Sequence, residues 1–335
     1  MLRRDDAWVW DSWIIDDGEL FHLFFLSAPR SLGDPELRHF HASVGHATST
    51  DLVDWTDHGT ALAASDDGWD DLSIWTGSVI RRPDGRWAMF YTALGSRGYG
   101  ADDQRVGLAV SDDLFTWERV GDGPIVTADA RWYRTQPGDL QASATWRDPF
   151  VFPDPGGDGW RMLLTARAVD GAPGDDGVLG EARSRDLLRW EVGPPVSAAG
   201  TGFSQLEVTH VHAIDGRPVL TFSCHPIDQT AERIARVGRH TVWAVVGEPG
   251  GSLAGPWDVR DAQAFTADPL LYAAPLVQRR DGSWAVLGFR TLDPGDRTAD
   301  DDGLTVGDPI AVHIEGGALV AVGPATEKET TTCSA

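Results

Sequence analysis

The segment Asp84-Gly85-Arg86-Trp87-Ala88-Met89-Phe90-Tyr91 combines a turn with a strand pattern, because apolar side chains follow the Asp-Gly pair at every second position. Asp-Gly between apolar runs is a strong hairpin signal, since both residues tolerate positive φ. Five copies of the pattern occur in the chain, with spacings of 67, 74, 57 and 66 residues. The other four copies begin at Asp17-Gly18, Asp158-Gly159, Asp215-Gly216 and Asp281-Gly282. The 335 residues therefore predict five structural repeats.

A second motif recurs in phase with the first and consists of a serine, an aspartate-leucine pair and a tryptophan. Its copies span residues 49–55, 111–117 and 184–190, with an altered copy at 252–257. Each repeat then holds an inner strand, an Asp-Gly hairpin, a third strand and a turn into a fourth, which is one four-stranded blade. We predict an all-β chain folded as a five-bladed β-propeller. A β-sandwich would give shorter and less regular spacings, and a β-helix a much shorter period.

The repeats fill residues 1–323, which we predict to form a single catalytic propeller domain. Residues 324–335 are polar, and we expect them to be a disordered tail. Helical periodicity is weak throughout, and residues 231–237 are the one short helix candidate.

Charge and composition narrow the function classes. The formal net charge of −23 argues against nucleic acid and anionic membranes as partners. No run approaches the roughly 18 apolar residues that a membrane span needs. No apolar stretch of signal-peptide length follows the N-terminus, so we expect a cytoplasmic protein. The two cysteines, Cys224 and Cys333, form neither a disulfide framework nor a metal motif, and we expect no metal and no cofactor.

The segments that precede the five hairpins would lie nearest the propeller axis. Three of them carry an acidic residue, although acidic residues are uncommon in strands and costly to bury. Each acid alone could be a structural residue or part of an ion pair, but their matched position in three repeats predicts a shared site: Asp11, Asp148 and Glu207. Pro149 and Pro275 support this placement, because proline belongs on edge strands and the innermost strand is an edge. The five inner segments are residues 8–15, 74–80, 146–152, 205–212 and 271–278.

Other residues of the inner segments could bind a sugar. Trp10 and Trp13 flank Asp11 and could form a flat apolar wall. Gly77 is a position without a side chain, where a ligand can come close. The substrate-binding candidates are Trp10, Trp13, Trp75, Ser78, Arg147, Gln205 and Tyr272.

The segment around Glu207 is expected to alternate, with Gln205, Glu207 and Thr209 on one face. Three nearby histidines match no standard metal-site spacing and are expected to be structural: His210, His212 and His225.

Paired carboxyl groups at one site suit glycosidic cleavage. One carboxylic acid protonates the leaving oxygen, while a carboxylate on the opposite face attacks in a retaining enzyme or activates water in an inverting one. Glu207 is the better candidate for the acid, and Asp11 for the nucleophile. Asp148 could bind sugar hydroxyls, with the neighbouring Arg147 as its ion-pair partner.

Four motifs follow one another in the order of a known superfamily: Trp10-Asp11-Ser12-Trp13, residues 46–52, Trp75-Thr76-Gly77-Ser78 and Arg147-Asp148-Pro149. In these motifs the chain resembles the β-fructosidase superfamily, glycoside hydrolase families 68 (levansucrase-type) and 32, with family 43 as a more distant relative. The resemblance implies a five-bladed propeller in which Asp11 is the nucleophile, Asp148 stabilises the transition state and Glu207 is the general acid/base. It also implies that the segment from Trp75 to Ser78 borders the sugar.

Three functions remain open at this point. The first is a retaining β-fructofuranosidase or fructosyltransferase acting on a small fructoside such as sucrose. The second is an inverting enzyme acting on arabinofuranosides or related pentosides, with Asp11 as the base. The third is a sugar-binding propeller without catalysis, which would need no paired acids. The sequence decides neither the sugar and its acceptor nor the oligomeric state.

Overall fold

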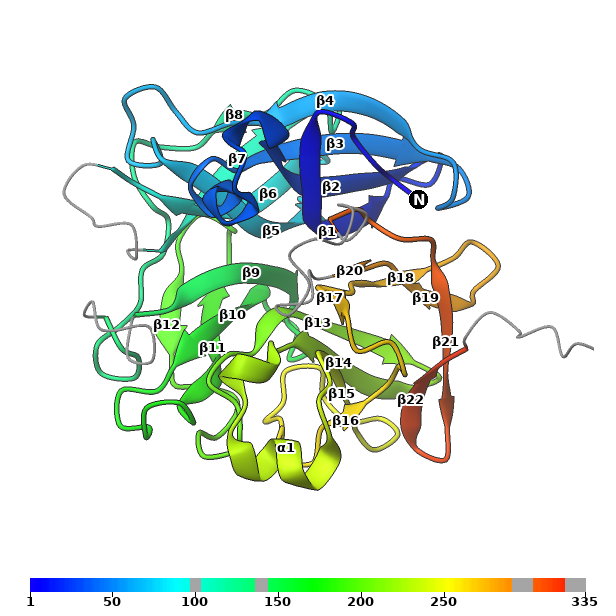
Figure 1. Ribbon diagram of the computed structural model, residues 1–335. Coiled ribbons are helices and arrows are strands. Elements are labelled where there is room, and N and C mark those ends of the chain that lie inside the picture. The colour runs from blue at the N-terminus through cyan, green and yellow to red at the C-terminus, as the bar shows by residue number, and fades with distance from the viewer. Residues whose placement is uncertain (97–103, 136–143, 291–303, 323–335) are drawn as a thin grey trace, which may run out of the picture.

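The computed structural model describes residues 1–96, 104–135, 144–290 and 304–322. Their strands form five four-stranded antiparallel sheets around a central axis, together with a short two-stranded sheet (Figure 1). The prediction of an all-β, five-bladed β-propeller is confirmed. A single α-helix occurs in the described residues, α1 (Ala231–Val237), at the predicted place. The predicted tail, 324–335, lies outside the described residues, and the domain boundary stays a prediction.

Each of the first four blades is built from four strands that are consecutive in the sequence. Blade 1 contains β1 (Ala7–Asp16), β2 (Phe21–Pro29), β3 (Ser43–Ser49) and β4 (Thr56–Leu62). Blade 2 contains β5 (Ser73–Arg81), β6 (Trp87–Leu94), β7 (Arg105–Ser111) and β8 (Glu118–Arg119). Blade 3 contains β9 (Trp146–Pro153), β10 (Trp160–Arg167), β11 (Gly177–Ser184) and β12 (Glu191–Gly193). Blade 4 contains β13 (Glu207–Ile214), β14 (Arg217–Ser223), β15 (Val242–Val246) and β16 (Gln263–Ala264).

Blade 5 differs because its two inner strands are interrupted. Its sheet contains β18 (Leu276–Gln278), β19 (Trp284–Val286), β21 (Ile310–Glu315) and β22 (Ala318–Ala321). The two-stranded sheet continues these inner strands toward the axis with β17 (Leu271–Tyr272) and β20 (Phe289–Arg290). The predicted inner strand 271–278 is therefore split between Tyr272 and Leu276, and Pro275 in the gap has no N–H for a ladder bond.

The N-terminal residues close the ring against blade 5. Leu2 forms a bridge with Val306, and the backbone N–H of Val9 donates to the carbonyl oxygen of Leu304 at 3.1 Å. The first blade therefore contacts the last, and no long strand edge is left at the junction.

The serine-aspartate-leucine motif forms the same turn in three blades. In each copy the serine hydroxyl accepts a hydrogen bond at 2.9 Å from the N–H of the leucine three residues later. The leucines are left-handed, with φ of 69°, 68° and 65° at Leu52, Leu114 and Leu187. The recurring motif is thus a recurring turn, which explains why the sequence repeats in phase with the blades.

The Asp-Gly turns follow the predicted mechanism in one blade. All five glycines have positive φ, but only in blade 4 is the aspartate left-handed too, so that Asp215 and Gly216 close a two-residue hairpin. Blade 1 has a longer turn, in which Asp17 Oδ1 accepts from the N–H groups of Glu19 and Leu20, both at 2.7 Å. A side-chain acceptor replaces the second left-handed residue there.

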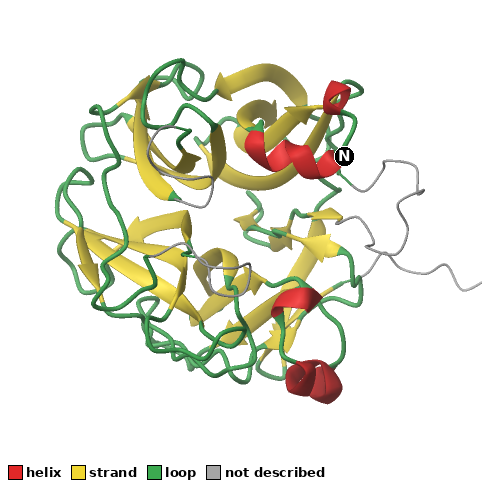
Figure 2. Cartoon of the chain, turned by 60° about the vertical axis from the view of Figure 1, so that its left-hand side comes forward, coloured by secondary structure: helices red, strands yellow, loops and turns green. Residues whose placement is uncertain are grey.

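The helical segments are short and belong to the connections that follow strands in the chain, outside the sheets (Figure 2). The 3₁₀ turns η1 (Arg30–Leu32) and η2 (Pro35–Phe40) follow β2, and η3 (Pro226–Asp228) follows β14. Within the described residues, no helix is long and apolar enough to cross a membrane.

Candidate active site

Backbone irregularities set the direction of the side chains near the axis. The register of each of the first four inner strands breaks once: between Trp10 and Ser12 in β1, between Trp75 and Gly77 in β5, and between Glu207 and His210 in β13. In β9 the break lies between Arg147 and Phe150, opposite residues 163–165 of β10. A bulge re-aims a side chain and ends regular pairing, and it is common beside active sites. The residues without a regular partner include Asp11, Thr76, Asp148 and Val208.

Two non-glycine residues in these breaks are left-handed, as is a third in the gap between β17 and β18. The φ angles are 56° at Asp148, 48° at Val208 and 43° at Ala273. Such conformations cost about 1–3 kcal/mol each and persist where the surroundings impose them. The break after Glu207 disrupts the predicted two-residue period at Thr209. Gln205 and Glu207 both accept from Arg147, as expected for side chains on one face, whereas Thr209 Oγ1 donates to the carbonyl oxygen of Leu206.

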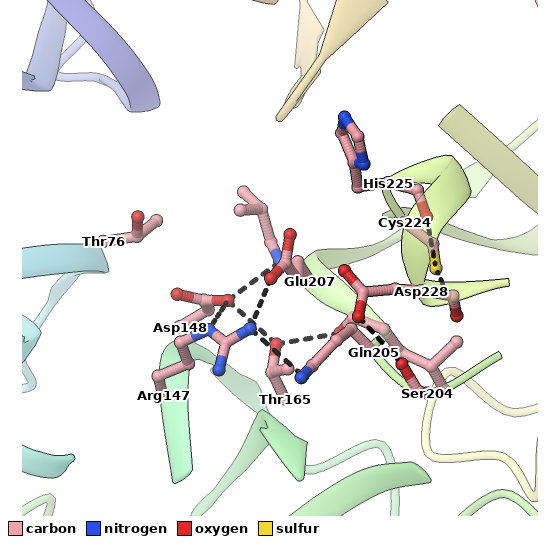
Figure 3. A network of polar contacts seen from close by, with 12 residues as sticks. Thr76, Arg147, Asp148, Thr165, Ser204, Gln205, Glu207, Cys224, His225 and Asp228 are labelled. Carbon is pink, nitrogen blue, oxygen red and sulfur yellow. Dashed lines mark hydrogen bonds and ion pairs between the residues drawn. The ribbon is translucent and has the colours of Figure 1, made fainter. Parts of the chain in front are cut away.

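Arg147 of β9 is the cation that links the acidic side chains (Figure 3). Its Nη2 donates to Glu207 Oε1 and to Gln205 Oε1, the latter at 3.1 Å. Its Nε lies 3.5 Å from Asp148 Oδ2, and its Nη1 donates to Gln104 Oε1 at 3.2 Å. The pKa of Arg147 is raised by Glu207 and Asp148 in spite of burial, so the guanidinium is a fixed positive charge between two carboxyl groups.

Asp148 is buried and held from three sides. Thr165 Oγ1 donates to Asp148 Oδ2 at 2.8 Å, and the N–H of Val208 donates to the same oxygen at 3.3 Å. The Asp148 N–H donates to Thr92 Oγ1 at 2.9 Å. Burial raises the pKa of Asp148 to about 6, against the opposing effect of Arg147.

Asp11 lies on β1 and contacts blade 2 through one hydroxyl group. Thr76 Oγ1 donates to Asp11 Oδ2 at 2.5 Å. Burial, together with the charges of Asp148 and Glu207, raises the pKa of Asp11 to about 7, while the Thr76 hydrogen bond opposes the shift. Hydrogen bonds through Thr76 and Thr92 connect Asp11 to Asp148, and Arg147 contacts Asp148 and Glu207, so the structure brings together the three acids predicted from the sequence.

Glu207 is bound by two side chains from neighbouring blades. Arg147 of blade 3 donates to Oε1, and the Tyr272 hydroxyl of blade 5 donates to Oε2. Burial and the Glu207 carboxylate raise the pKa of Tyr272 well above its ordinary value, so Tyr272 stays a hydrogen-bond donor. The carboxyl group of Glu207 is thus fixed in orientation.

Comparison with known proteins gives the family. Residues 12–247 match the model of the glycosyl hydrolases family 32 N-terminal domain. The chain belongs to glycosyl hydrolase family 32.

The family 32 chain matches only part of its curated relatives. A fructan 6-exohydrolase of Beta vulgaris is 27% identical over 186 residues, which are 55% of this chain and 28% of that protein. A sucrose-6-phosphate hydrolase of Bacillus subtilis (strain 168) is 29% identical over 183 residues, which are 54% of this chain and 32% of that protein. The chain thus spans about a third of the length of these relatives.

Solved structures share the fold over almost the whole family 32 chain. The inulosucrase from Halalkalicoccus jeotgali bound to kestose superposes with a TM-score of 0.74 at 22% identity, covering 96% of this chain and 90% of that chain. Bacillus subtilis levansucrase gives a TM-score of 0.69 at 16% identity, covering 95% and 86% of the two chains. At these identities the likeness establishes the fold.

The tryptophans beside Asp11 are packed. Trp10 and Trp13 are 3% and 1% exposed and belong to the hydrophobic cluster between blades 1 and 2. Trp13 stacks on Phe24, with ring centroids 6.2 Å apart, and the Arg38 guanidinium covers the Trp10 ring at 5.6 Å. Contrary to the prediction, neither ring presents an open face to a sugar.

The two candidates that flank Gly77 have different surroundings. Trp75 is half-buried and its Nε1 donates to the carbonyl oxygen of His39 at 2.6 Å, so it remains a candidate at the rim of the site. Ser78 is 4% exposed, and its Oγ accepts from the N–H of Val151 at 3.1 Å. The prediction of a sugar contact is wrong for Ser78, because the buried hydroxyl joins blade 2 to blade 3.

Sequence reasoning missed the threonines of the site. Thr92 Oγ1 donates to the carbonyl oxygen of Thr76 at 3.0 Å and accepts from Asp148 N, so hydroxyl groups connect Asp11 to Asp148 across blade 2. Aligning the repeats would have found Thr76, which holds the same place in β5 as Asp11 in β1. Thr92 lies on β6 and Thr165 on β10, the second strands of their blades. An alignment of the inner strands would not include them.

The predicted histidine roles can be compared with the packing. The His210 ring lies 4.6 Å from that of Phe150, and the His212 ring 5.2 Å from that of Trp284, so both pack between blades as structural residues. The His225 side chain accepts from the N–H of Ile227 in η3. In the part of the chain that the structure describes, no group of three or more His, Cys, Asp or Glu side chains could hold a metal ion.

Proposed function

We propose that this chain is a retaining glycoside hydrolase or fructosyltransferase acting on a small β-fructofuranoside such as sucrose. The observation that carries the proposal is the contact network of three carboxyl groups: Arg147 lies against both Asp148 and Glu207, and Thr76 and Thr92 connect Asp11 to Asp148. Clustered acids with perturbed pKa values are typical of catalytic sites. Family membership and the names of the relatives, a fructan exohydrolase and a sucrose-6-phosphate hydrolase, support the choice of sugar.

In the proposed reaction Asp11 attacks the anomeric carbon of the fructosyl unit. Glu207 donates its proton to the glycosidic oxygen, so that the C–O bond breaks and a fructosyl-enzyme ester forms on Asp11. Glu207, now a carboxylate, then removes a proton from water or from an acceptor hydroxyl, which attacks the ester and regenerates Asp11.

The remaining polar residues orient the reacting groups. Tyr272 and Arg147 fix the two oxygens of Glu207. Asp148, held by Thr165 and Val208 N, offers an acceptor to the hydroxyl groups of the furanose, and Arg147 offsets its charge. Charges fixed before the substrate binds need no reorganisation in the transition state.

The test is product analysis with sucrose, fructans and nitrophenyl furanosides. We expect fructose to be released first as the anomer with retained configuration. NMR spectra of the first product, recorded before the anomers equilibrate, measure this. Asp11→Ala should abolish turnover while circular dichroism shows an intact fold, and Asp122→Ala, at an exposed aspartate, should keep full activity. Full activity of Asp11→Ala would reject the assignment. Release of the inverted anomer, or turnover of arabinofuranosides alone, would favour the inverting pentosidase.

A further inference from the structure

A fourth carboxyl group lies on the far side of Glu207 from Asp148. Asp228 ends η3, the short turn that follows β14. Figure 3 shows its carboxyl group beside Glu207, with Thr76 and Asp148 on the opposite side. Under the proposed function Glu207 protonates the leaving oxygen, so the leaving sugar lies next to Glu207 and away from the nucleophile. Asp228 is therefore on the leaving-group side.

Asp228 is held by the segment that leads into Glu207. Ser204 Oγ donates to Asp228 Oδ1 at 3.0 Å, and the Ser204 N–H donates to the Asp228 carbonyl oxygen at 2.8 Å. Gln229 anchors the turn, because its Nε2 donates to the carbonyl oxygens of Cys224 and His240 at 2.9 and 2.6 Å. Within the described ranges, Oδ2 of Asp228 has no hydrogen-bond partner and can accept a bond from a ligand.

Two acidic side chains, Glu207 and Asp228, lie on this side. Burial and the Glu207 carboxylate raise the pKa of Asp228, while Ser204, Arg147 and Arg167 oppose the shift. The guanidinium of Arg147 is bound by Glu207 and Asp148, and Arg167 is 1% exposed. Neither arginine therefore presents its guanidinium to a leaving group beside Asp228.

We propose that Asp228 selects a neutral leaving sugar, whose hydroxyl groups it accepts as hydrogen-bond donors, over a phosphorylated one. This inference rests on the proposed function. A sugar phosphate carries about −2 charge at neutral pH, and juxtaposition with the Asp228 carboxylate disfavours its binding. Such a preference would distinguish this chain from the sucrose-6-phosphate hydrolase among its relatives.

The experiment compares kcat/KM for sucrose, sucrose 6-phosphate and nitrophenyl β-fructofuranoside. We expect the wild-type protein to prefer sucrose over its phosphate by about 30-fold or more, and Asp228→Asn to reduce that ratio about tenfold. The nitrophenyl substrate has neither sugar hydroxyls nor a phosphate on its leaving group, so Asp228→Asn should change its kcat/KM less than that of sucrose or its phosphate. Asp122→Asn removes one negative charge from an exposed turn and should leave all three values unchanged. Added salt should lower the wild-type ratio, because it screens repulsion.

The outcomes separate the two proposals. Wild-type turnover of the phosphate as fast as that of sucrose would overturn the role of Asp228, as would equal ratios in Asp228→Asn and wild-type protein. If the protein turned over the nitrophenyl substrate but neither sucrose nor sucrose 6-phosphate, the proposed role of Asp228 would also be overturned. Turnover of none of the three would reject the proposed function itself.

Discussion

The blade 1 and blade 4 sides of the site hold their carboxyl groups in opposite ways. Asp11 on blade 1 accepts one hydrogen bond, from Thr76, and its pKa rises to about 7. Glu207 on blade 4 is bound to the Arg147 guanidinium and to the Tyr272 hydroxyl. One acid is buried with little compensation, whereas the other has a partner for each oxygen.

The difference indicates how two carboxyl groups can take different roles in one site. A poorly compensated carboxylate is destabilised as a charge and is relieved when it forms an ester. A carboxyl group fixed at both oxygens can transfer a proton without changing its position. Environments that differ in this way are the usual means of assigning acid, base and nucleophile.

The largest expected effect on kcat comes from replacing the carboxyl group on each side of the site in turn. Asp11→Asn should lower kcat about 10⁴-fold or more with both sucrose and nitrophenyl β-fructofuranoside, because no ester can form. Glu207→Gln should lower kcat for sucrose about 10²–10⁴-fold, but the cleavage of the nitrophenyl bond much less, since that leaving group needs little protonation. Stopped-flow measurement of nitrophenol release separates the steps.

Azide provides the matched control for this comparison. It attacks an ester without general-base help, so it should accelerate turnover of the nitrophenyl substrate by Glu207→Gln and yield a fructosyl azide. Azide that reacts in Asp11→Asn must attack the anomeric carbon directly, so any azide product of this variant should be inverted. Retained product from Asp11→Asn, or inverted product from Glu207→Gln, would exchange the two roles and contradict the assignment.

The sequence predicts those parts of the molecule that repeat. Recurring Asp-Gly turns predicted the five blades, and an acidic residue in each of three inner segments, Asp11, Asp148 and Glu207, predicted the axial cluster. What it could not predict depends on backbone irregularity and on contacts between blades. The break after Glu207 disrupted an expected alternation, and burial of Ser78 against Val151 N is a property of two blades packed together. Asp228 lies in a loop with no repeat partner.

A second, smaller effect concerns stability. The pKa of Asp11 is about 7 in the folded protein against an ordinary 3.8, so the folded state holds more protons between these values. Stability is therefore retained at about pH 4 and is lost as the pH rises through 7. Asp11→Asn should raise the free energy of unfolding at pH 8 by about 4 kcal/mol at most, with little gain at pH 4. Urea denaturation at both pH values measures this difference.

Glu207→Gln should act in the opposite direction. It removes a carboxylate from the buried Arg147 guanidinium, which should lower the free energy of unfolding by about 1–3 kcal/mol at pH 8. Equal effects of the two substitutions would mean that the two sides of the site are not different electrostatic environments.

The smallest effect should come from the single hydroxyl on the blade 1 side. The Thr76 hydrogen bond lowers the pKa of Asp11 against burial, so Thr76→Val should raise that pKa above about 7. Since the nucleophile must be ionised, the acidic limb of the kcat/KM profile should move upward by about one pH unit. Thr76→Ser keeps the hydroxyl and should retain the wild-type limb. A lower plateau with an unmoved limb in Thr76→Val would mean that Thr76 only packs β5 against β1, and that Asp11 does not set the pH dependence.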